Sequence, residues 1–441
     1  MRWSSPPAPP TRRRLPSRPR PRKTVGRAPR PSGGRPLGLF IHWGLYSAQP
    51  KASWNGRTMP TRRRRRATVG TRSDPDAALE VPDADYRALA KNFNPVNFDA
   101  EALVQEAMRA GMKYIAITSK HHDGFALWDS AVSDFDLGAT PCKRDLLGEL
   151  AAACRKHGIK LGFYYSHWQD WEAPGGARPF WKPQPDDKAF EAYWKGKSLA
   201  QVAELIDRYD PDLFWFDTWN DEARATITPA RRDELIRLIR TKSPRCLING
   251  RIAAYDPGKD VDFLEMGDNA FPETWPGKPW QTPATMQHSW GWHAKDYSWK
   301  PSGQMVRLLA QCAALGGNYL LNIGPKFDGS LPAPTVRRLR ELGGWMAANG
   351  ESISGSARVG KAPWGWWTRS KDDGARYAHV FTWPAGGKVD LGPLERAPVS
   401  AALLDTAQPL PLSREGDHWI ATGPASAPDA WDTVIVLRFA P

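Results

Sequence analysis

The chain alternates between two hydrophobic patterns along most of its length. In one, apolar residues recur every three to four positions, as on the buried face of a helix. These segments are residues 100–110, 145–157, 198–209, 231–240 and 303–315. In the other, short runs are almost continuously apolar, at residues 113–118, 160–165, 213–216, 245–249 and 318–323. Such runs are typical of parallel strands covered on both faces, so the pattern predicts an α/β fold.

Residues that stop helices mark the ends of these segments. Gly111 and Gly158 follow the first two, Pro244 follows the fourth, and Gly316 with Gly317 follows the fifth. Ser302 is the expected N-cap of the fifth helix. Repeated helix and strand units of this size predict a (β/α)8-type, TIM-like barrel.

The pattern changes near residues 350–356. From about Gly355 the helical period fades, and short alternating runs appear at residues 376–383, 418–421 and 432–439. Alternation with proline and glycine between the runs predicts an antiparallel β-sandwich. We therefore expect a barrel over residues 37–352 and a sandwich over residues 353–441.

Polar side chains follow the predicted barrel strands. They are His42 after the apolar run at residues 39–41, then Lys120, His121, His122 and Asp123, then Ser166 and His167, then Asp217, then Asn249 and Arg251. Active sites of such barrels are built from the loops after the strands, so we expect these residues to surround one pocket. The chain also holds 22 tryptophans, several of them beside these polar residues. Indole rings among hydrogen-bonding groups favour a sugar as ligand.

The net charge of +14 does not describe the folded part of the chain. Residues 1–36 hold eleven Arg or Lys, ten prolines and no acid, and Arg57 with residues 62–66 adds six more cations. The remainder carries −3. We expect residues 1–36 to be a disordered arm and residues 57–76 an irregular basic insert in the barrel, with no nucleic-acid partner.

Other signals set limits on the chemistry and the compartment. Cys142, Cys154, Cys246 and Cys312 show no paired metal spacing and lie in predicted helices and strands, so we expect reduced thiols. The pair His121–His122 lacks a third spaced ligand, so we expect no metal and no cofactor. We see no secretory h-region and no membrane-spanning stretch.

An ordered set of motifs resembles the α-L-fucosidases of glycoside hydrolase family 29. The motifs are residues 38–47 (GLFIHWGLYS), 120–130 (KHHDGFALWDS), 143–145 (KRD), 161–166 (LGFYYS), 215–217 (WFD) and 317–324 (GNYLLNIG). The resemblance runs from about residue 38 to residue 353. It implies a barrel followed by a β-sandwich, and a retaining exo-α-L-fucosidase that releases terminal fucose from glycans. It also suggests a secreted or periplasmic bacterial enzyme, and it leaves the oligomeric state open.

The resemblance implies roles for individual residues. Asp217 would be the nucleophile, kept ionised by Arg251, and Tyr165 and Arg251 would lie beside the histidines that bind the sugar. The residues that hold fucose hydroxyls would be His42, His121 and His122, and Trp215 or Trp290 would lie near the C6 methyl group. A retaining mechanism needs a second group about 5–5.5 Å from the nucleophile to protonate the leaving oxygen. The structural alternative is that Asp217 is an acid merely paired with Arg251.

The general acid is the role at which this chain departs from the family's pattern. Many family members have Trp-Glu-Thr where this chain has Trp280, Gln281 and Thr282, and an amide cannot donate and recover a proton. We expect Glu273 to serve first, then Glu265 and Asp268. If Gln281 lies at the acid's position, the chain would be a slow hydrolase or a catalytically impaired fucose-binding protein. A third class is a polyanion binder that uses the basic tracts.

Residues 1–36 and 57–76 both depart from the family's pattern. Our hypothesis is that they are misread frames of a GC-rich gene, because the resemblance resumes at residues 86–90. Resequencing of codons 1–80 that finds no frame error would reject it.

Overall fold

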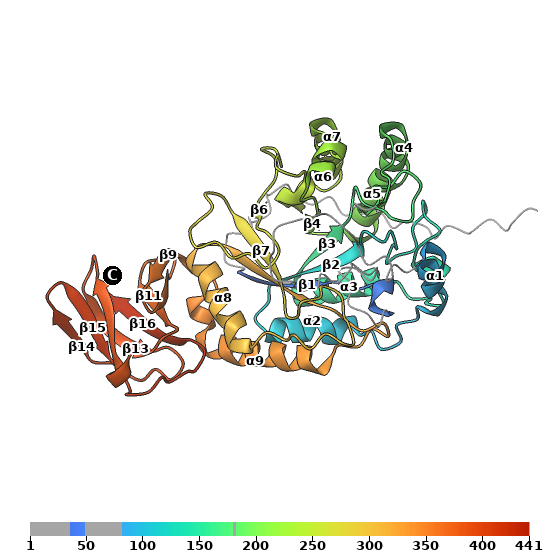
Figure 1. The fold of residues 1–441 in the computed structure, drawn as a ribbon. Helices are drawn as coiled ribbons and strands as arrows, with labels where there is room; N and C mark the ends of the chain where they lie inside the picture. The colour runs from blue at the N-terminus through green and yellow to red at the C-terminus, as the bar shows by residue number, and fades with distance from the viewer. Residues whose placement is uncertain (1–35, 49–81, 180–181, 441) are drawn as a thin grey trace, which may run out of the picture.

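The computed structural model describes residues 36–48, 82–179 and 182–440. Eight parallel strands form one curled sheet, and antiparallel sheets form a separate C-terminal unit (Figure 1). This confirms the predicted TIM-like barrel with a β-sandwich. The predicted insert at 57–76 and all but the last residue of the predicted arm lie outside the described residues.

The barrel strands run in the order β5-β4-β3-β2-β1-β8-β7-β6. Their bounds are β1 Leu37–Ile41, β2 Tyr114–Lys120, β3 Lys160–Tyr165, β4 Leu213–Trp215, β5 Leu247–Ile248, β6 Leu264–Glu265, β7 Trp280–Thr285 and β8 Asn318–Ile323. Apart from β6 and β7, each of these strands lies within or next to a run that the hydrophobic pattern predicts. β6 and β7 are short or polar, and the pattern gave no strand there.

Helices pack outside the sheet. They are α1 Asp83–Ala88, α2 Ala100–Arg109, α3 Leu146–His157, α4 Asp187–Tyr193, α5 Leu199–Tyr209, α6 Asp221–Thr226, α7 Pro229–Lys242, α8 Ser302–Ala314 and α9 Ala333–Asn349. Helix α3 shows how the sequence sets such bounds: the Asp145 carboxylate accepts from the Gly148 N–H, and Gly158 ends the helix at a φ of 69°. The expected N-cap role of Ser302 is wrong. Ser302 is the first helical residue, and its hydroxyl bonds Glu341.

The sheet is uneven around its circumference. Strands β1, β2, β3, β7 and β8 are five to seven residues long, whereas β4 has three residues and β5 and β6 have two each. Within residues 182–440, β5 and β6 meet at one isolated bridge, Asn249 to Phe263, and no α-helix separates β5 from β6 or β6 from β7. The barrel is therefore closed by loops at this seam.

Large side chains fill the interior of the barrel. Phe40, Ala116, Tyr164, Trp215 and Leu320 form one buried cluster inside the sheet. They come from alternate positions of β1, β2, β3, β4 and β8, as expected when successive side chains on a strand point to opposite faces. This cluster is the floor on which the pocket described below is built.

The C-terminal unit holds two sheets, β13-β16-β11-β10-β9 and β12-β15-β14. The bounds are β9 Ala357–Ala362, β10 Gly365–Arg369, β11 Ala375–Val380, β12 Lys388–Pro393, β13 Pro398–Leu403, β14 Leu412–Glu415, β15 His418–Thr422 and β16 Thr433–Phe439. Helix α8 packs on β9 and β10, so it lies between the barrel and the sandwich (Figure 1).

The remaining expectations concern thiols and membranes. All four cysteines are buried and unbridged. None of the helices in the described ranges has the length and hydropathy needed to cross a membrane.

Candidate functional site

A pocket opens at the carboxyl ends of the barrel strands, where the sequence predicts one. Its lining residues are Phe40, His42, His121, Tyr164, Trp215, Asp217, Arg251, Asp268 and Trp290. They come from β1, β3 and β4 and from the loops after β1, β2, β4, β5, β6 and β7. The structure thus brings together seven of the twelve site residues expected from the sequence, with Phe40 and Tyr164 in addition.

Asp217 lies just beyond β4, and its carboxyl group faces three partners. Arg251 Nη1 is 3.0 Å from Oδ1, the Tyr164 hydroxyl donates to Oδ2 at 2.9 Å, and His122 Nε2 is 3.6 Å from Oδ2. The indole N–H of Trp168 fixes the backbone by donating to the Asp217 carbonyl at 2.8 Å. Asp217 is therefore held rigidly with one carboxylate edge toward the cation.

Burial raises the pKa of Asp217 to about 6, although the positive charge of Arg251 opposes this shift. The negative charge of Asp268 adds to the increase. At neutral pH the carboxylate form still predominates, because the pH lies above this pKa. The charge of Arg251 lowers the pKa of Asp217, which is the direction that we predicted. The loss of hydration on burial raises this pKa by more.

Arg251 joins two carboxylates. It lies in the turn Gly250–Ile252 after β5, where Nη1 contacts Asp217 and Nη2 contacts Asp268 Oδ1 at 2.7 Å. Nη2 also donates to the Met266 carbonyl at 2.7 Å, and the guanidinium lies over the Trp215 ring at 5.2 Å. Since both acids touch one planar guanidinium, they lie close together on the same side of the pocket.

Asp268 is held by the residue that follows it. Asn269 has a φ of 55°, a left-handed conformation that asparagine tolerates better than most residues. Its side-chain oxygen accepts from the Thr285 N–H at 3.0 Å and from Lys300 Nζ at 2.6 Å, and its N–H donates to the Pro283 carbonyl at 3.0 Å. The loop after β6 is therefore tied to β7, and Asp268 has a defined place although it is partly exposed.

Two histidines offer complementary hydrogen-bonding atoms. His42 Nδ1 lies 2.6 Å from the side-chain oxygen of Asn322, which can only accept, so Nδ1 carries the proton and Nε2 is an acceptor. His121 Nδ1 accepts from the His122 backbone N–H at 2.8 Å, so its proton is on Nε2, a donor. Burial lowers the pKa of His42 to about 3 and the pKa of His121 well below its usual value. Both rings are thus neutral near pH 7.

His122 lies deeper than the other two. Its Nδ1 is 2.6 Å from the Ser166 hydroxyl, which itself donates to the Gln169 carbonyl, so His122 Nδ1 donates to Ser166. Burial lowers its pKa well below the usual value. His122 is not among the residues that line the pocket, but its Nε2 lies 3.6 Å from Asp217 Oδ2.

Aromatic rings form the rest of the wall. The His121 ring stacks on Tyr164 at 4.8 Å, and Tyr164 stacks on Trp215 at 5.4 Å. Trp290 lies 4.9 Å from His42, between ring centres. Because these rings are buried and packed on each other, the shape of the pocket is set before any ligand binds.

Several expected site residues lie elsewhere. The Tyr165 hydroxyl donates to Gln201, outside the sheet, and its neighbour Tyr164 faces the pocket instead. Tyr164 shares the inward face of β3 because side chains alternate along a strand. This alternation is the signal in the sequence that could have identified it.

The acid expected first as proton donor is far from the pocket. Glu273 is exposed and pairs with Lys361 of the sandwich at 2.6 Å. Glu265 is half-buried as a residue, but both of its carboxyl oxygens are buried without a hydrogen-bond partner in the described ranges, and burial raises its pKa well above the usual value. Of the three candidate acids, Asp268 alone lines the pocket.

Gln281 supports the floor of the pocket. Its side-chain oxygen accepts from the Trp215 indole at 3.0 Å, and its amide donates to the Tyr114 hydroxyl at 2.7 Å. Gln281 is buried and does not line the pocket. The pocket therefore keeps two carboxyl groups, those of Asp217 and Asp268, although an amide stands at position 281.

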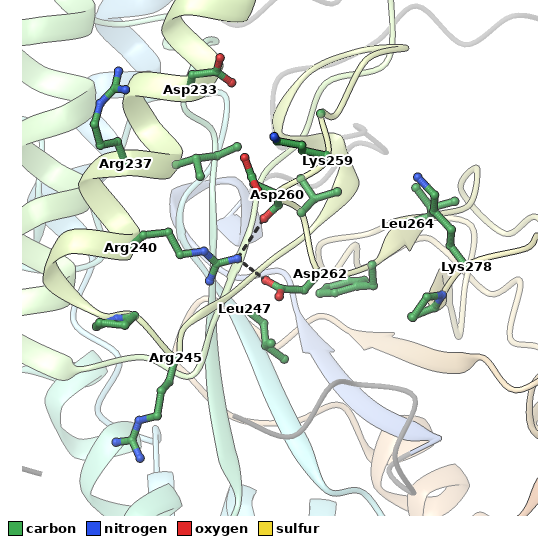
Figure 2. Close-up of a pocket in the computed structure, with 16 residues that line it drawn as sticks. Asp233, Arg237, Arg240, Arg245, Leu247, Lys259, Asp260, Asp262, Leu264 and Lys278 are labelled. Carbon is green, nitrogen blue, oxygen red and sulfur yellow. Dashed lines mark hydrogen bonds and ion pairs between the residues drawn. The ribbon is translucent and has the colours of Figure 1, made fainter. Parts of the chain in front are cut away.

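A second, larger groove of 720 Å³ lies at the opposite end of the seam (Figure 2). Arg240 occupies its centre and bonds the Asp260 carbonyl and the Asp262 carboxylate. The charged ends of Arg237 and Arg245 point away from each other (Figure 2). The cations do not converge on one point, so we place the functional site at the other end of the barrel.

No group of three His, Cys, Asp or Glu side chains in the described part of the chain is arranged to hold a metal ion. The chemistry available in the pocket is that of two carboxylates, one arginine, neutral imidazoles and a phenol. That set is sufficient for glycoside hydrolysis.

Comparisons with known proteins agree with this chemistry. A family model described as alpha-L-fucosidase matches residues 33–351. Tissue alpha-L-fucosidase of Rattus norvegicus is 29% identical over 411 residues, covering 87% of this chain and 81% of its own length. The Bos taurus enzyme is 30% identical over 374 residues, covering 80% and 75%.

Solved structures extend the likeness to the whole fold. Alpha-L-fucosidase isoenzyme 1 of Paenibacillus thiaminolyticus is 31% identical with a TM-score of 0.77, covering 93% of this chain and 98% of its own. A family 29 alpha-L-fucosidase of Bacteroides thetaiotaomicron, trapped as a covalent intermediate with 2-fluoro-fucosyl fluoride in a glutamate-to-glutamine variant, is 26% identical with a TM-score of 0.79, covering 95% and 98%. This chain belongs to the alpha-L-fucosidase family of glycoside hydrolases.

Proposed function

We propose that the protein is a retaining exo-α-L-fucosidase that removes terminal α-L-fucose from glycans, with Asp217 as nucleophile and Asp268 as general acid and base. The observation that carries the proposal is the contact of one guanidinium, Arg251, with both carboxylates. Retaining glycosidases hold their two carboxyl groups about 5–5.5 Å apart, and a shared guanidinium favours such closeness.

In the first step Asp217 attacks the anomeric carbon. The bond from C1 to the leaving oxygen breaks, and Asp268 gives that oxygen its proton. In the second step Asp268 takes a proton from water, the water oxygen bonds C1, and the ester to Asp217 breaks. Asp217 suits the nucleophile's role because Arg251 and the Tyr164 hydroxyl stabilise its ionised form.

Asp268 suits the acid's role because of its place. It lines the pocket yet is a third exposed, on the loop after β6, whereas Asp217 is almost fully buried. A proton donor to a departing sugar must reach the open side of the pocket, and the base of the second step must reach water.

The neutral histidines suit recognition of a monosaccharide. The acceptor at His42 Nε2 and the donor at His121 Nε2 complement hydroxyl groups, which both donate and accept. The Trp215 and Trp290 rings offer apolar surface for the C6 methyl group of fucose. The floor of packed rings supports release of a terminal sugar rather than cleavage within a chain.

A fucose-binding protein without turnover is the alternative. It requires a pocket that lacks a second carboxylate, and the position of Asp268 counts against it. A polyanion-binding role rests on the basic tracts, which lie outside the described residues.

The test is covalent trapping with 2-fluoro-fucosyl fluoride followed by mass mapping. We expect the label on the peptide that contains Asp217, and a loss of kcat/KM of at least about a thousandfold in Asp217→Ala. Asp221→Asn, an exposed acid four residues further on, is the matched control and should retain activity. A label on another peptide, or turnover without any label, would reject the proposed nucleophile.

A further inference from the structure

Tyr255 stands out in the loop after β5. Its side chain is 67% exposed, and its φ is 64°. A bulky side chain rarely adopts the left-handed region, because its Cβ crowds the backbone. Single exposed aromatic residues are common on protein surfaces, but this one is also held in a costly conformation. Residues held in this way are concentrated at ligand sites.

The surrounding contacts hold Tyr255 in place. Its hydroxyl donates to the Trp219 carbonyl at 3.3 Å, so the side chain extends toward the loop after β4. The next residue, Asp256, accepts from Arg232 at 2.8 Å through its carboxylate and at 3.0 Å through its carbonyl. The exposed ring is therefore presented by a fixed loop.

This loop adjoins the catalytic loops. Trp219 follows Asp217 by two residues, and its ring centre lies 5.2 Å from that of His122. The Thr218 hydroxyl donates to the Arg251 carbonyl at 2.8 Å, which joins the loops after β4 and β5. Tyr255 thus lies beside the loops that carry Asp217 and Arg251, and it is not among the residues that line the pocket.

We propose that Tyr255 is the platform for the leaving group, on which the pyranose ring that bears the fucose stacks. Buried rings line the pocket proposed for the fucose, so we place the next sugar at its rim. An exposed, fixed aromatic face fits the apolar C–H face of a pyranose. A preorganised ring also loses little conformational freedom when a sugar binds. This inference rests on the proposed exo-fucosidase function and extends it to the sugar beyond the bond.

The experiment compares two substrates, fucosyllactose and α-L-fucosyl fluoride, whose leaving group has no ring. Tyr255→Gly suits the positive φ, so it should fold at least as stably as the natural protein. We expect its kcat/KM to fall about tenfold or more on fucosyllactose and to stay within about twofold on fucosyl fluoride. Tyr255→Trp, which restores an aromatic face, should recover most of the loss.

The matched control is Val399→Ala, which removes an apolar side chain of equal exposure, 66%, from the sandwich. It should leave both substrates unchanged. Equal loss on the two substrates in Tyr255→Gly, or no loss on fucosyllactose, would overturn the inference. Failure of the proposed function is distinct, because the natural protein would then hydrolyse neither substrate.

Discussion

The two halves of the barrel rim differ in structure and in chemistry. Long strands β7, β8, β1, β2 and β3 form one half, and it supplies neutral groups such as His42, His121 and Tyr164. The short strands β4, β5 and β6 form the other, and it supplies the charged Asp217, Arg251 and Asp268. The proposed recognition of the sugar is thus built on the regular ladder, and the proposed catalysis on the irregular seam.

The difference has a physical cause. A long parallel ladder fixes the direction of every side chain, which suits hydrogen bonds to sugar hydroxyls. Where strands are only two residues long, the loops can turn and bring three charges onto one point. Arg251 needs this freedom, because its guanidinium reaches Asp217 after β4 and Asp268 after β6 at once.

The largest effect should come from removing the cation of the seam. Arg251→Met keeps an apolar stem over Trp215 but loses the charge, so we expect kcat/KM to fall about a hundred- to a thousandfold. As the proposed nucleophile, Asp217 must be ionised to attack, so the rate should fall as the pH drops through its pKa. Because Arg251 lowers that pKa, the acid limb of the pH profile should move to higher pH in the variant. Profiles of kcat/KM from about pH 4 to pH 9 measure both effects.

Arg237→Met is the control for this variant. Arg237 is an exposed arginine of α7 that lines the remote groove, and its loss should change neither the rate nor the profile. An acid limb that stays at the same pH in Arg251→Met would mean that Asp217 does not govern that limb.

A smaller and more selective effect should follow Asp268→Asn. We expect kcat/KM to fall about a hundredfold for sugar leaving groups, because their oxygen must be protonated. For 2,4-dinitrophenyl fucoside, whose leaving group needs no proton, the change should be within a few fold. Added azide should restore turnover and yield α-L-fucosyl azide.

Glu273→Gln is the matched control, because it changes an exposed acid on the same loop that bonds Lys361. It should be without effect on either substrate. A uniform loss on both substrates in Asp268→Asn would assign Asp268 a structural role through Arg251 instead.

The regular half should respond differently. His42→Ala removes the acceptor at Nε2, so we expect the affinity for fucose as a competitive inhibitor to fall about 10- to 100-fold, whatever the leaving group. Burial holds the pKa of His42 at about 3, so this loss should be constant from pH 5 to pH 9. His157→Ala, at the end of α3, is the control. A loss that depends on the leaving group would contradict the division of the rim into two halves.

The same contrast explains what the sequence could predict. On the regular half, apolar runs gave β1, β2, β3 and β8, and the polar residue after each run was placed at the rim. The sequence prediction there named Tyr165 as the tyrosine of the site. Side chains alternate along β3, and it is Tyr164 that points inward and bonds Asp217, whereas Tyr165 bonds Gln201. The resemblance to the family supplied the roles, which the hydrophobic pattern alone does not contain.

On the seam, the sequence predicted fewer of the strands and did not identify the acid that lines the pocket. β6 has two residues, and no hydrophobic run marks it. Nothing in local spacing separates Asp268 from Glu265 or Glu273, because a left-handed Asn269 and its bonds to β7 decide which acid reaches the pocket. These are contacts between residues distant in sequence, and a single chain without its fold does not reveal them.

The smallest effect on activity should come from Glu265, and it tests whether this residue has a structural role only. The carboxyl oxygens of Glu265 are buried, and burial raises the pKa of this group well above its usual value. A raised folded-state pKa means that the native state binds this proton more tightly than the unfolded state does. Stability is therefore lost as the pH rises from the unfolded pKa toward the folded one.

Glu265→Gln keeps the shape and removes the ionisation. We expect the free energy of unfolding to match that of the natural protein near pH 4 and to exceed it by on the order of 1 kcal/mol near pH 8, in urea titrations at both pH values. Glu415→Gln, an exposed acid of β14, should show no such difference. Turnover should stay within about threefold, because a group with no place in the pocket has no proton to give the leaving oxygen. A selective loss of activity of Glu265→Gln on sugar leaving groups would contradict this. Glu265 would then be the general acid, and Asp268 and Arg251 would only position the residues around it.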